Sequence, residues 1–207
     1  MQEYITISES FTAEYSEKHS RFIATCFHCE TEEQASEIIA TQKSKYWDAR
    51  HNVYAYILQN GTARFSDDGE PHGTAGMPML ELIKGSGITN VVVVVTRYFG
   101  GILLGTGGLV RAYSTSTRDA LNGAQKVLMC ACCEYEIDCD YGSFDRLTRL
   151  ISDTNGMVQD TNFTDKVTVK VMYKKVDSEV FLDKLCETFA SKITAKAINE
   201  IFFPFKL

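Results

Sequence analysis

A glycine-rich loop is the stretch of this 207-residue sequence whose residue types are best suited to hold a charged ligand. An apolar segment, residues 91–95, comes before the loop, and a helical pattern begins near Thr106. A strand, a glycine-rich loop and a helix N-terminus form a cradle for anions, because exposed backbone amides and the helix dipole both favour negative charge there. The sequence therefore predicts an anion cradle formed by the backbone of Gly105, Thr106, Gly107 and Gly108.

Two nucleotide-binding motifs nearly match this loop and then depart from it. Gly100, Gly105 and Thr106 have the glycine spacing of a P-loop, but the lysine that would reach the terminal phosphates is missing. The run from Gly105 to Val110 ends in valine where a dinucleotide fingerprint requires glycine or alanine. The loop alone therefore does not predict a nucleotide site.

Arginines close to the loop favour contact with a nucleic acid. Arg97 follows the apolar segment, and the spacing of Arg111 and Arg118 places both on one face of the predicted helix. Arginines next to an aromatic side chain are typical of surfaces that contact phosphates and bases. The predicted nucleic-acid surface comprises Arg97, Tyr98, Arg111 and Arg118, extended by Lys84, Arg21 and Lys18.

The acidic loop Asp67-Asp68-Gly69-Glu70 offers a different interpretation of the same arginines. Its carboxylates could pair with the arginines and neutralise much of the basic surface, while the glycines of the later loop serve only close packing of helix on sheet. Asp68 or Glu70 could also cap a helix or turn, with Gly69 supplying a positive φ. The sequence leaves both interpretations open.

Metal-binding and catalytic patterns are weak in this sequence. His51, His72 and the acidic loop have no fixed ligand spacing. Cys26 and Cys29 have the spacing of a zinc knuckle, but they fall on a predicted strand, where residues i and i+3 face opposite sides. No serine lies in a nucleophile elbow. We expect no catalytic residues, no metal and no cofactor, and a binding protein rather than an enzyme.

Composition limits the class of protein. Apolar residues make up 44% of the chain and charged residues 23%, as in ordinary globular domains. The formal net charge of −6 argues against a protein coated in basic surface, although a local basic patch is compatible with it. Seven cysteines behind an N-terminus that lacks signal-peptide features predict reduced thiols in the cytoplasm. No apolar run approaches the roughly 20 residues that a membrane span requires, so we expect no membrane partner.

Hydrophobic periodicity predicts the elements that position the loop. Residues 3–30 alternate as strands do, with a polar turn at residues 18–20. Thr31 and Gln34 form the pattern of a capping box ahead of a helix that ends near Lys45. The remaining predicted elements of the first domain are a hairpin around Asn60-Gly61, a helix from about Thr74 to Gly85, a central strand at 91–95, and a helix over 106–122.

The last third of the chain predicts a second, smaller domain. The pattern gives strands over residues 127–139, 156–162, 166–174 and 193–203, and helices over 143–153 and 178–190, with Ser143 as a helix N-cap. This β-α-β-β-α-β order is the split βαβ plan. No low-complexity linker separates the halves, and we expect domains at residues 1–130 and 131–207.

The sequence resembles the IMPACT/YigZ family, in its bacterial two-domain form. The motifs that carry this similarity are Lys18-His19-Ser20-Arg21-Phe22-Ile23, Arg50-His51-Asn52-Val53-Tyr54-Ala55-Tyr56, Asp67-Asp68-Gly69-Glu70-Pro71, Gly73-Thr74-Ala75-Gly76, and Thr96-Arg97-Tyr98-Phe99-Gly100-Gly101 through Arg111-Ala112-Tyr113. The resemblance implies an α+β fold. Its first domain would be ribosomal S5 domain 2-like, similar to domain IV of translocation elongation factors. Its second would be ferredoxin-like, similar to their domain V.

The same resemblance guides the expected function. Eukaryotic members are translation regulators that bind a ribosome-associated scaffold and so restrain an amino-acid-starvation kinase. For a bacterial-type chain, similarity to translation-factor domains implies RNA or ribosome binding. Met77 stands where the family usually has a cation, and His72 where a serine is usual. We expect a translation-linked regulatory protein that binds RNA or the ribosome; the alternatives are a protein-binding regulator of a stress or translation pathway, and a small-molecule or nucleotide binder at the glycine-rich loop.

Overall fold

The computed structural model describes residues 3–207, which divide mainly into two compact units, Tyr4–Leu128 and Met129–Phe205. Strand β7 (Lys126–Cys139) carries the chain from the first unit into the second. The domain boundary expected after residue 130 lies inside this strand.

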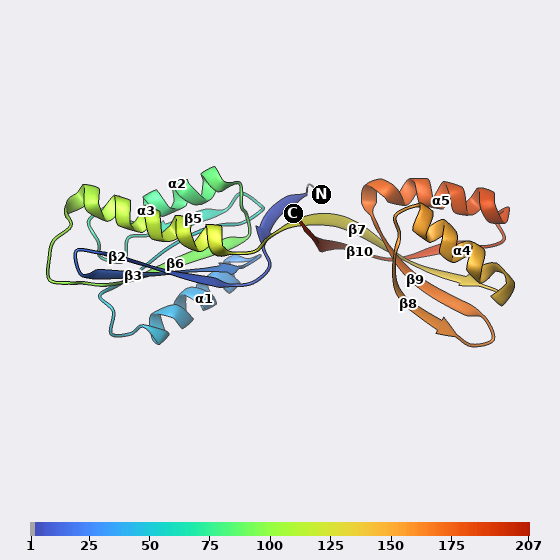
Figure 1. Ribbon diagram of the computed structural model, residues 1–207, viewed down its shortest axis with the longest axis horizontal. Coiled ribbons are helices and arrows are strands. Elements are labelled where there is room, and N and C mark those ends of the chain that lie inside the picture. Colours follow the sequence, from blue (N-terminus) through green and yellow to red (C-terminus); the bar gives the residue numbers. More distant parts are fainter. Residues whose placement is uncertain (1–2) are drawn as a thin grey trace. The chain divides into compact units, whose positions relative to one another are not determined.

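The first unit is built on a five-stranded antiparallel sheet in the order β2-β3-β6-β4-β5 (Figure 1). These strands are β2 (Phe11–Glu17), β3 (Ser20–His28), β4 (His51–Ile57), β5 (Ala63–Ser66) and β6 (Val91–Tyr98). The short strand β1 (Tyr4–Ile7) lies outside this sheet, and its Ile5 carbonyl accepts a hydrogen bond from the Thr89 amide at 2.9 Å.

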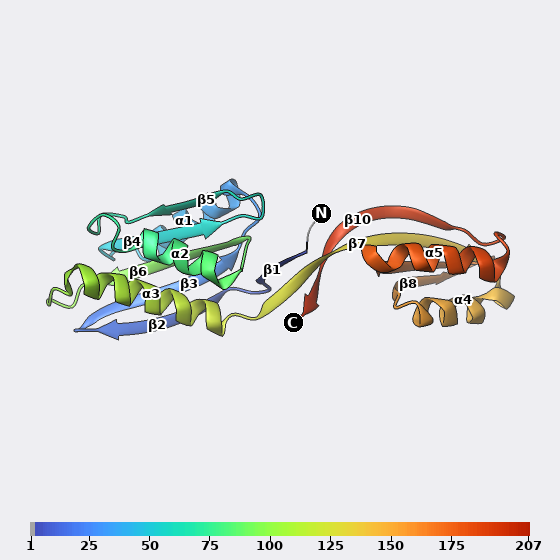
Figure 2. The ribbon, with the colours of Figure 1, turned by 90° about the horizontal axis from the view of Figure 1, so that it is seen from above.

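Helices cover both faces of this sheet, which is why its middle strand is apolar throughout. Helices α2 (Gly76–Ser86) and α3 (Gly105–Gly123) pack side by side on one face, and α1 (Glu32–Lys45) covers the other (Figures 1 and 2). Val91, Val93 and Val95 belong to the core under α2 and α3, whereas Val92 and Val94 belong to the core under α1. The prediction of a central strand at residues 91–95 is therefore confirmed.

Local sequence signals explain several element ends. Thr31 Oγ1 accepts from the Gln34 amide at 3.2 Å, and Gln34 Oε1 accepts from the Glu30 amide at 2.7 Å, which confirms the predicted cap of α1. Lys18 and His19 both have positive φ, as a two-residue hairpin turn between β2 and β3 requires. The Asn60-Gly61 hairpin is also confirmed, because β4 and β5 pair on either side of it.

The second unit contains β8 (Met157–Phe163), β9 (Val167–Lys174) and β10 (Ala195–Lys206) together with β7. β9 lies between β7 and β8, and β10 pairs with β7 on the other side. Helices α4 (Tyr141–Asp153) and α5 (Lys175–Phe189) lie on one face of this sheet and fill its core with Leu147, Ile151, Phe181, Leu185 and Phe189 (Figure 1). The unit is ferredoxin-like.

The predicted N-cap of α4 was wrong. The helix begins at Tyr141, and its cap is Asp140, whose Oδ1 accepts from the Ser143 amide at 2.7 Å. Ser143 therefore lies in the first turn as a donor. Both residue types are good caps, and the carboxylate at the earlier position gains more from the helix dipole.

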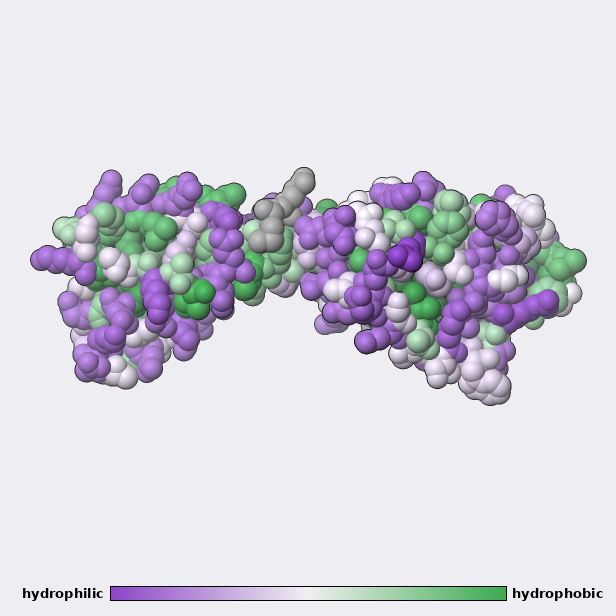
Figure 3. All heavy atoms as spheres, turned by 180° about the vertical axis from the view of Figure 1, so that it is seen from behind, coloured by the Kyte–Doolittle hydropathy of each residue, from purple (hydrophilic) through white to green (hydrophobic). Residues whose placement is uncertain are grey.

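Apolar residues are largely enclosed in these cores. On the face drawn in Figure 3, hydrophilic residues cover much of each unit, and hydrophobic residues form small separate clusters between them. Cys26 and Cys29 belong to cores on opposite faces of the first sheet, as the strand period predicts. Within residues 3–207, no helix is both long and apolar enough to cross a bilayer, and no three His, Cys, Asp or Glu side chains gather as metal ligands would.

Candidate functional site

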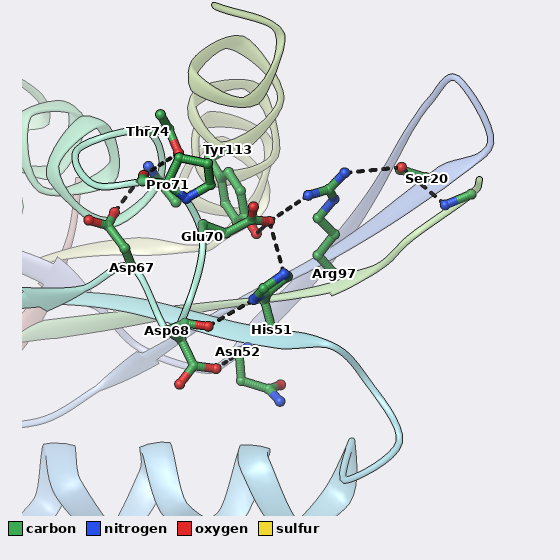
Figure 4. A network of polar contacts seen from close by, with 12 residues as sticks. Ser20, His51, Asn52, Asp67, Asp68, Glu70, Pro71, Thr74, Arg97 and Tyr113 are labelled. Carbon is green, nitrogen blue, oxygen red and sulfur yellow. Dashed lines mark hydrogen bonds and ion pairs between the residues drawn. The ribbon is translucent and has the colours of Figure 1, made fainter. Parts of the chain in front are cut away.

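The acidic loop turns inward and sends its three carboxylates to three different partners (Figure 4). The Glu70 amide donates to the Asp67 carbonyl at 2.9 Å and closes a tight turn. Asp68 and Gly69, the central residues of this turn, have φ of 44° and 85°. Gly69 supplies the positive φ that the sequence suggested, and Asp is one of the few other residues that adopt this conformation readily.

Asp67 caps helix α2 from outside the helix. Its Oδ1 accepts from the amides of Ala75 at 3.2 Å and Gly76 at 2.8 Å, and its Oδ2 accepts from the Gly73 amide at 2.9 Å. The helix has no side-chain cap at its own N-cap position, Ala75. The sequence suggested Asp68 or Glu70 for a capping role, but the turn places Asp67 against these amides instead.

Replacing Asp67 with alanine should lower the free energy of unfolding by about 1–2 kcal/mol, because two amides at the start of α2 and the Gly73 amide before it lose their acceptor. Asp67→Asn keeps one acceptor oxygen and should lose less than the alanine variant. Urea denaturation of the three proteins checks this prediction. Equal losses in the two variants would contradict a capping role for the carboxylate oxygens.

Asp68 ties the loop to strand β4 and helix α1. Its Oδ2 accepts from the Asn52 amide at 2.7 Å, beyond the point where β5 stops pairing with β4. Its Oδ1 accepts from Lys43 Nζ at 2.7 Å. The His51 ring bonds the Asp68 carbonyl through Nδ1 at 2.8 Å. Because a carbonyl only accepts, Nδ1 carries the proton, and Nε2 faces Glu70.

Glu70 is the buried centre of the network. Its Oε1 accepts from Arg97 Nη1 at 2.6 Å and from the Tyr113 hydroxyl at 2.7 Å, and His51 Nε2 lies 3.8 Å away. The side chains of Glu70 and Arg97 are only 3% and 7% exposed. Burial, followed by the charge of Glu70, raises the pKa of Tyr113, so the tyrosine stays protonated and keeps donating.

Arg97 lies inside the protein, which differs from the exposed position expected of a nucleic-acid contact. Its guanidinium stacks near the rings of Phe22 and Phe99, with its Cζ 5.5 and 5.6 Å from the two ring centres. Its Nη2 donates to Ser20 Oγ at 3.5 Å, and the same hydroxyl accepts from the Gly100 amide at 3.2 Å. For this arginine, pairing with the acidic loop is the interpretation that the structure supports.

Two predicted arginines remain on the surface. Arg111 and Arg118 are exposed on α3, and neither forms an ion pair within residues 3–207. The opposite face of α3 is buried through Leu109, Ala112, Tyr113, Ser116 and Ala120. The acidic loop therefore neutralises Arg97 and leaves Arg111 and Arg118 exposed on the outer face of α3, beside the exposed Asp119.

The other predicted contacts are only partly available. Exposed Arg21 forms a bidentate pair with Glu14 at 2.6 and 2.8 Å, and Lys84 pairs with Glu81 at 3.1 Å. The half-buried Tyr98 donates its hydroxyl to Asp48 at 2.8 Å, and Lys18 is exposed in the β2–β3 turn. Arg21 and Tyr98 are cross-strand partners in β3 and β6 on the sheet face that α1 covers, whereas Lys84 lies on α2, against the other face.

Sequence reasoning missed Lys126, the first residue of β7. It lines a hollow of about 320 Å³ together with Arg118 and the C-terminal end of α2 at Gly85 and Ser86. The backbone carbonyls at that helix end carry partial negative charge, which favours nearby cations. No local signal in the sequence predicts that Lys126 and Arg118 line the same hollow, since their proximity depends on how the chain passes from α3 into β7.

The predicted anion cradle forms the first turn of α3. The helix begins at Gly105, and its N-cap, Leu104, offers no side-chain hydrogen bond. Gly105 and Thr106 line a cavity of about 440 Å³, whose other polar walls are Arg50, His51, Glu70 and Arg97. The glycine-rich loop and the acidic loop thus belong to one site in the first unit.

Fold and site together define a two-domain α+β protein, with an S5 domain 2-like first domain built around a buried Arg–Glu pair and a ferredoxin-like second domain. The Impact N-terminal domain model matches residues 18–121, and a domain of unknown function (DUF1949) matches residues 137–192. The chain belongs to the IMPACT family.

Full-length relatives support this assignment. An IMPACT family member of Haemophilus influenzae is 34% identical over 97% of this chain and 96% of its own. The IMPACT family member YigZ of Escherichia coli is 34% identical over 88% of this chain and 92% of its own. A crystal structure of a hypothetical protein superposes with a TM-score of 0.64 at 32% identity, covering 96% of this chain and 98% of its own.

Proposed function

We propose that this protein is a cytoplasmic, non-enzymatic regulator linked to translation, and that it binds RNA, free or within the ribosome, through the outer face of α3. Family membership supports the link to translation, because the family resemblance implies translation regulators among the eukaryotic members. The observation that carries RNA binding is the exposure of Arg111 and Arg118, which have no ion-pair partner among the described residues.

Lys126 adds a third cation to this surface, since it shares a hollow with Arg118. Three cations on one face suit the phosphate backbone of RNA, which supplies most of the affinity of such contacts. Lys84 of α2 can join them, because an exposed ion pair like its pair with Glu81 is worth only about 0–1 kcal/mol and exchanges readily for phosphate. Arg21 cannot, because it alternates along β3 with Phe22, whose ring contacts Tyr113 of α3, and so points to the other face of the sheet. Arg97 plays no direct part, because it is committed to Glu70.

The test substitutes Arg111→Gln together with Arg118→Gln and measures binding to purified ribosomes and to structured RNA across a salt series. Each lost phosphate contact should reduce the slope of log affinity against log salt by about one. We therefore expect weaker binding at low salt and a shallower salt dependence in the double variant. Co-sedimentation and fluorescence anisotropy provide the two readouts.

A charge-matched control is Arg149→Gln with Lys184→Gln, two exposed cations of the second unit. This control changes the net charge equally and should leave binding intact. If both double variants weaken binding equally, the effect is one of net charge, and the α3 surface is not the site. An affinity that does not change with salt concentration, and that is the same in the α3 double variant, would indicate a protein partner and would contradict the proposal.

A further inference from the structure

The cavity beside the buried Arg97–Glu70 pair has the size and lining of a small-molecule site. Its volume of about 440 Å³ lies within the range of roughly 300–1,000 Å³ that is usual for ligand pockets. The acidic loop, the end of β6 and the start of α3 form its walls. None of the cations of the proposed RNA surface lines it, so the two sites are separate.

The lining of the cavity carries a positive charge that the protein does not neutralise. Arg97 is paired with Glu70 at 2.6 Å, and these two charges offset each other. Arg50 is exposed at the cavity and has no ion pair within residues 3–207; its guanidinium lies 6.0 Å from the centre of the Phe99 ring. The unpaired charge of Arg50 therefore favours a ligand that carries one negative charge.

Backbone donors in the lining of the cavity also lack a side-chain acceptor. No side chain caps α3, although its first residues, Gly105 and Thr106, line the cavity. Arg97 lines the cavity too, but its Nε, which has no hydrogen-bond partner among the described residues, is enclosed by protein and does not open onto the cavity. Amides at the start of a helix that no side chain caps are a favourable position for an acceptor supplied from outside.

The rest of the lining is apolar and partly open to solvent. Leu103 is 83% exposed and Phe99 is 40% exposed, and both line the cavity with Leu104, Leu109 and Pro71. Large apolar side chains that remain exposed at a concave surface favour an apolar ligand, because covering them removes their area from water.

We propose that this cavity binds a small amphipathic monoanion, an organic acid with one carboxylate and an apolar body. The carboxylate accepts from Arg50 and from the first amides of α3, where charge-assisted bonds and the helix dipole act together. The apolar body lies along Phe99, Leu103 and Leu109. A single negative charge is specified because Arg50 is the one cation of the lining that no carboxylate of residues 3–207 neutralises.

Calorimetric titration of the full-length protein with octanoate tests this inference, with octanamide as the uncharged analogue of equal length. We expect one octanoate per chain and binding of octanamide that is weaker by about tenfold, which corresponds to the loss of one charge-assisted hydrogen bond. Absence of saturable octanoate binding, or equal affinity for the two ligands, would overturn the proposal.

Three variants locate the site. Arg50→Gln should weaken octanoate about tenfold and leave octanamide unchanged, because only the charged head loses a partner. Leu103→Asp should weaken both ligands, because it places a charge where the apolar body lies. Arg149→Gln, in the other unit, should change neither. Octanoate binding that survives Arg50→Gln and Leu103→Asp would show that the ligand binds elsewhere, whatever the outcome for RNA.

Discussion

Substituting Arg97 with methionine should lower the free energy of unfolding by about 3–5 kcal/mol, the usual cost of leaving one member of a buried ion pair without its partner. Methionine fills much of the space of the arginine stem but leaves the carboxylate of Glu70, 3% exposed, without a counter-charge. Tyr113 continues to donate at 2.7 Å, yet one hydroxyl cannot replace a guanidinium. Urea denaturation followed by circular dichroism measures the loss.

The double variant Arg97→Met/Glu70→Gln separates charge from packing. Glutamine keeps an oxygen that accepts from Tyr113, but it carries no charge. The double variant should therefore recover at least about 2 kcal/mol relative to Arg97→Met alone. The single variant Glu70→Gln completes the cycle. If the losses of Arg97→Met and Glu70→Gln simply add in the double variant, Arg97 stabilises the protein by packing against Phe22 and Phe99 rather than by pairing with Glu70.

Arg64→Met is the matched surface control. Arg64 also pairs with a glutamate, Glu32 at 2.9 Å, but the two side chains are 64% and 40% exposed. Exposed pairs contribute about 0–1 kcal/mol, so this variant should stay near the stability of the parent protein. The comparison makes burial, rather than the presence of an ion pair, the cause of the large effect.

The buried pair also governs how RNA binding can be tested. A charge reversal such as Arg97→Glu would place two carboxylates together in a site that excludes water. The protein would lose stability, and lost RNA binding would follow from unfolding rather than from a lost contact. Arg111 and Arg118 are exposed and unpaired among the described residues, so their substitution tests the surface without disturbing the core.

The elements of the fold could be predicted because their signals are local. The five valines of β6, the Thr31 cap and the Asn60-Gly61 turn each depend on residues within a few positions. The ferredoxin-like unit followed from the order of its elements alone. The N-cap of α4 failed because Asp140 and Ser143 have similar capping propensity, so pattern alone does not choose between them.

The site was harder to predict because its contacts are distant in sequence. Arg97 and Glu70 are separated by 27 residues, and Tyr113 lies 43 residues beyond Glu70. The sequence pattern of an arginine at a strand end is the same whether its side chain enters the core or reaches solvent. The arginine can be buried only where a carboxylate partner offsets the loss of hydration of its charge. The sequence left open whether the arginines pair with the acidic loop or face solvent. In the structure, Arg97 pairs with Glu70, whereas Arg111 and Arg118 are exposed.

Substituting Gly100 with alanine should lower the free energy of unfolding by about 1–3 kcal/mol or more, as overpacked sites do. A Cβ at this position would lie 2.0 Å from the His19 carbonyl carbon and 2.2 Å from its oxygen. Both atoms are backbone, in a turn whose two central residues already have positive φ. The turn cannot move away without displacing Ser20, which links the Gly100 amide to Arg97.

Gly107→Ala is the control within the same glycine-rich loop, and it should have the opposite sign. Apart from its chain neighbours and the backbone of its own helix, no atom lies within 4 Å of the Cβ that would be added there, and the residue lies in α3 without a positive φ. Alanine in a helix is more stable than glycine by about 0.5–1 kcal/mol, so this variant should gain stability. Thermal and urea unfolding of both variants measure the contrast. If both lose stability, the loop is constrained by something other than the approach of Gly100 to the β2–β3 turn.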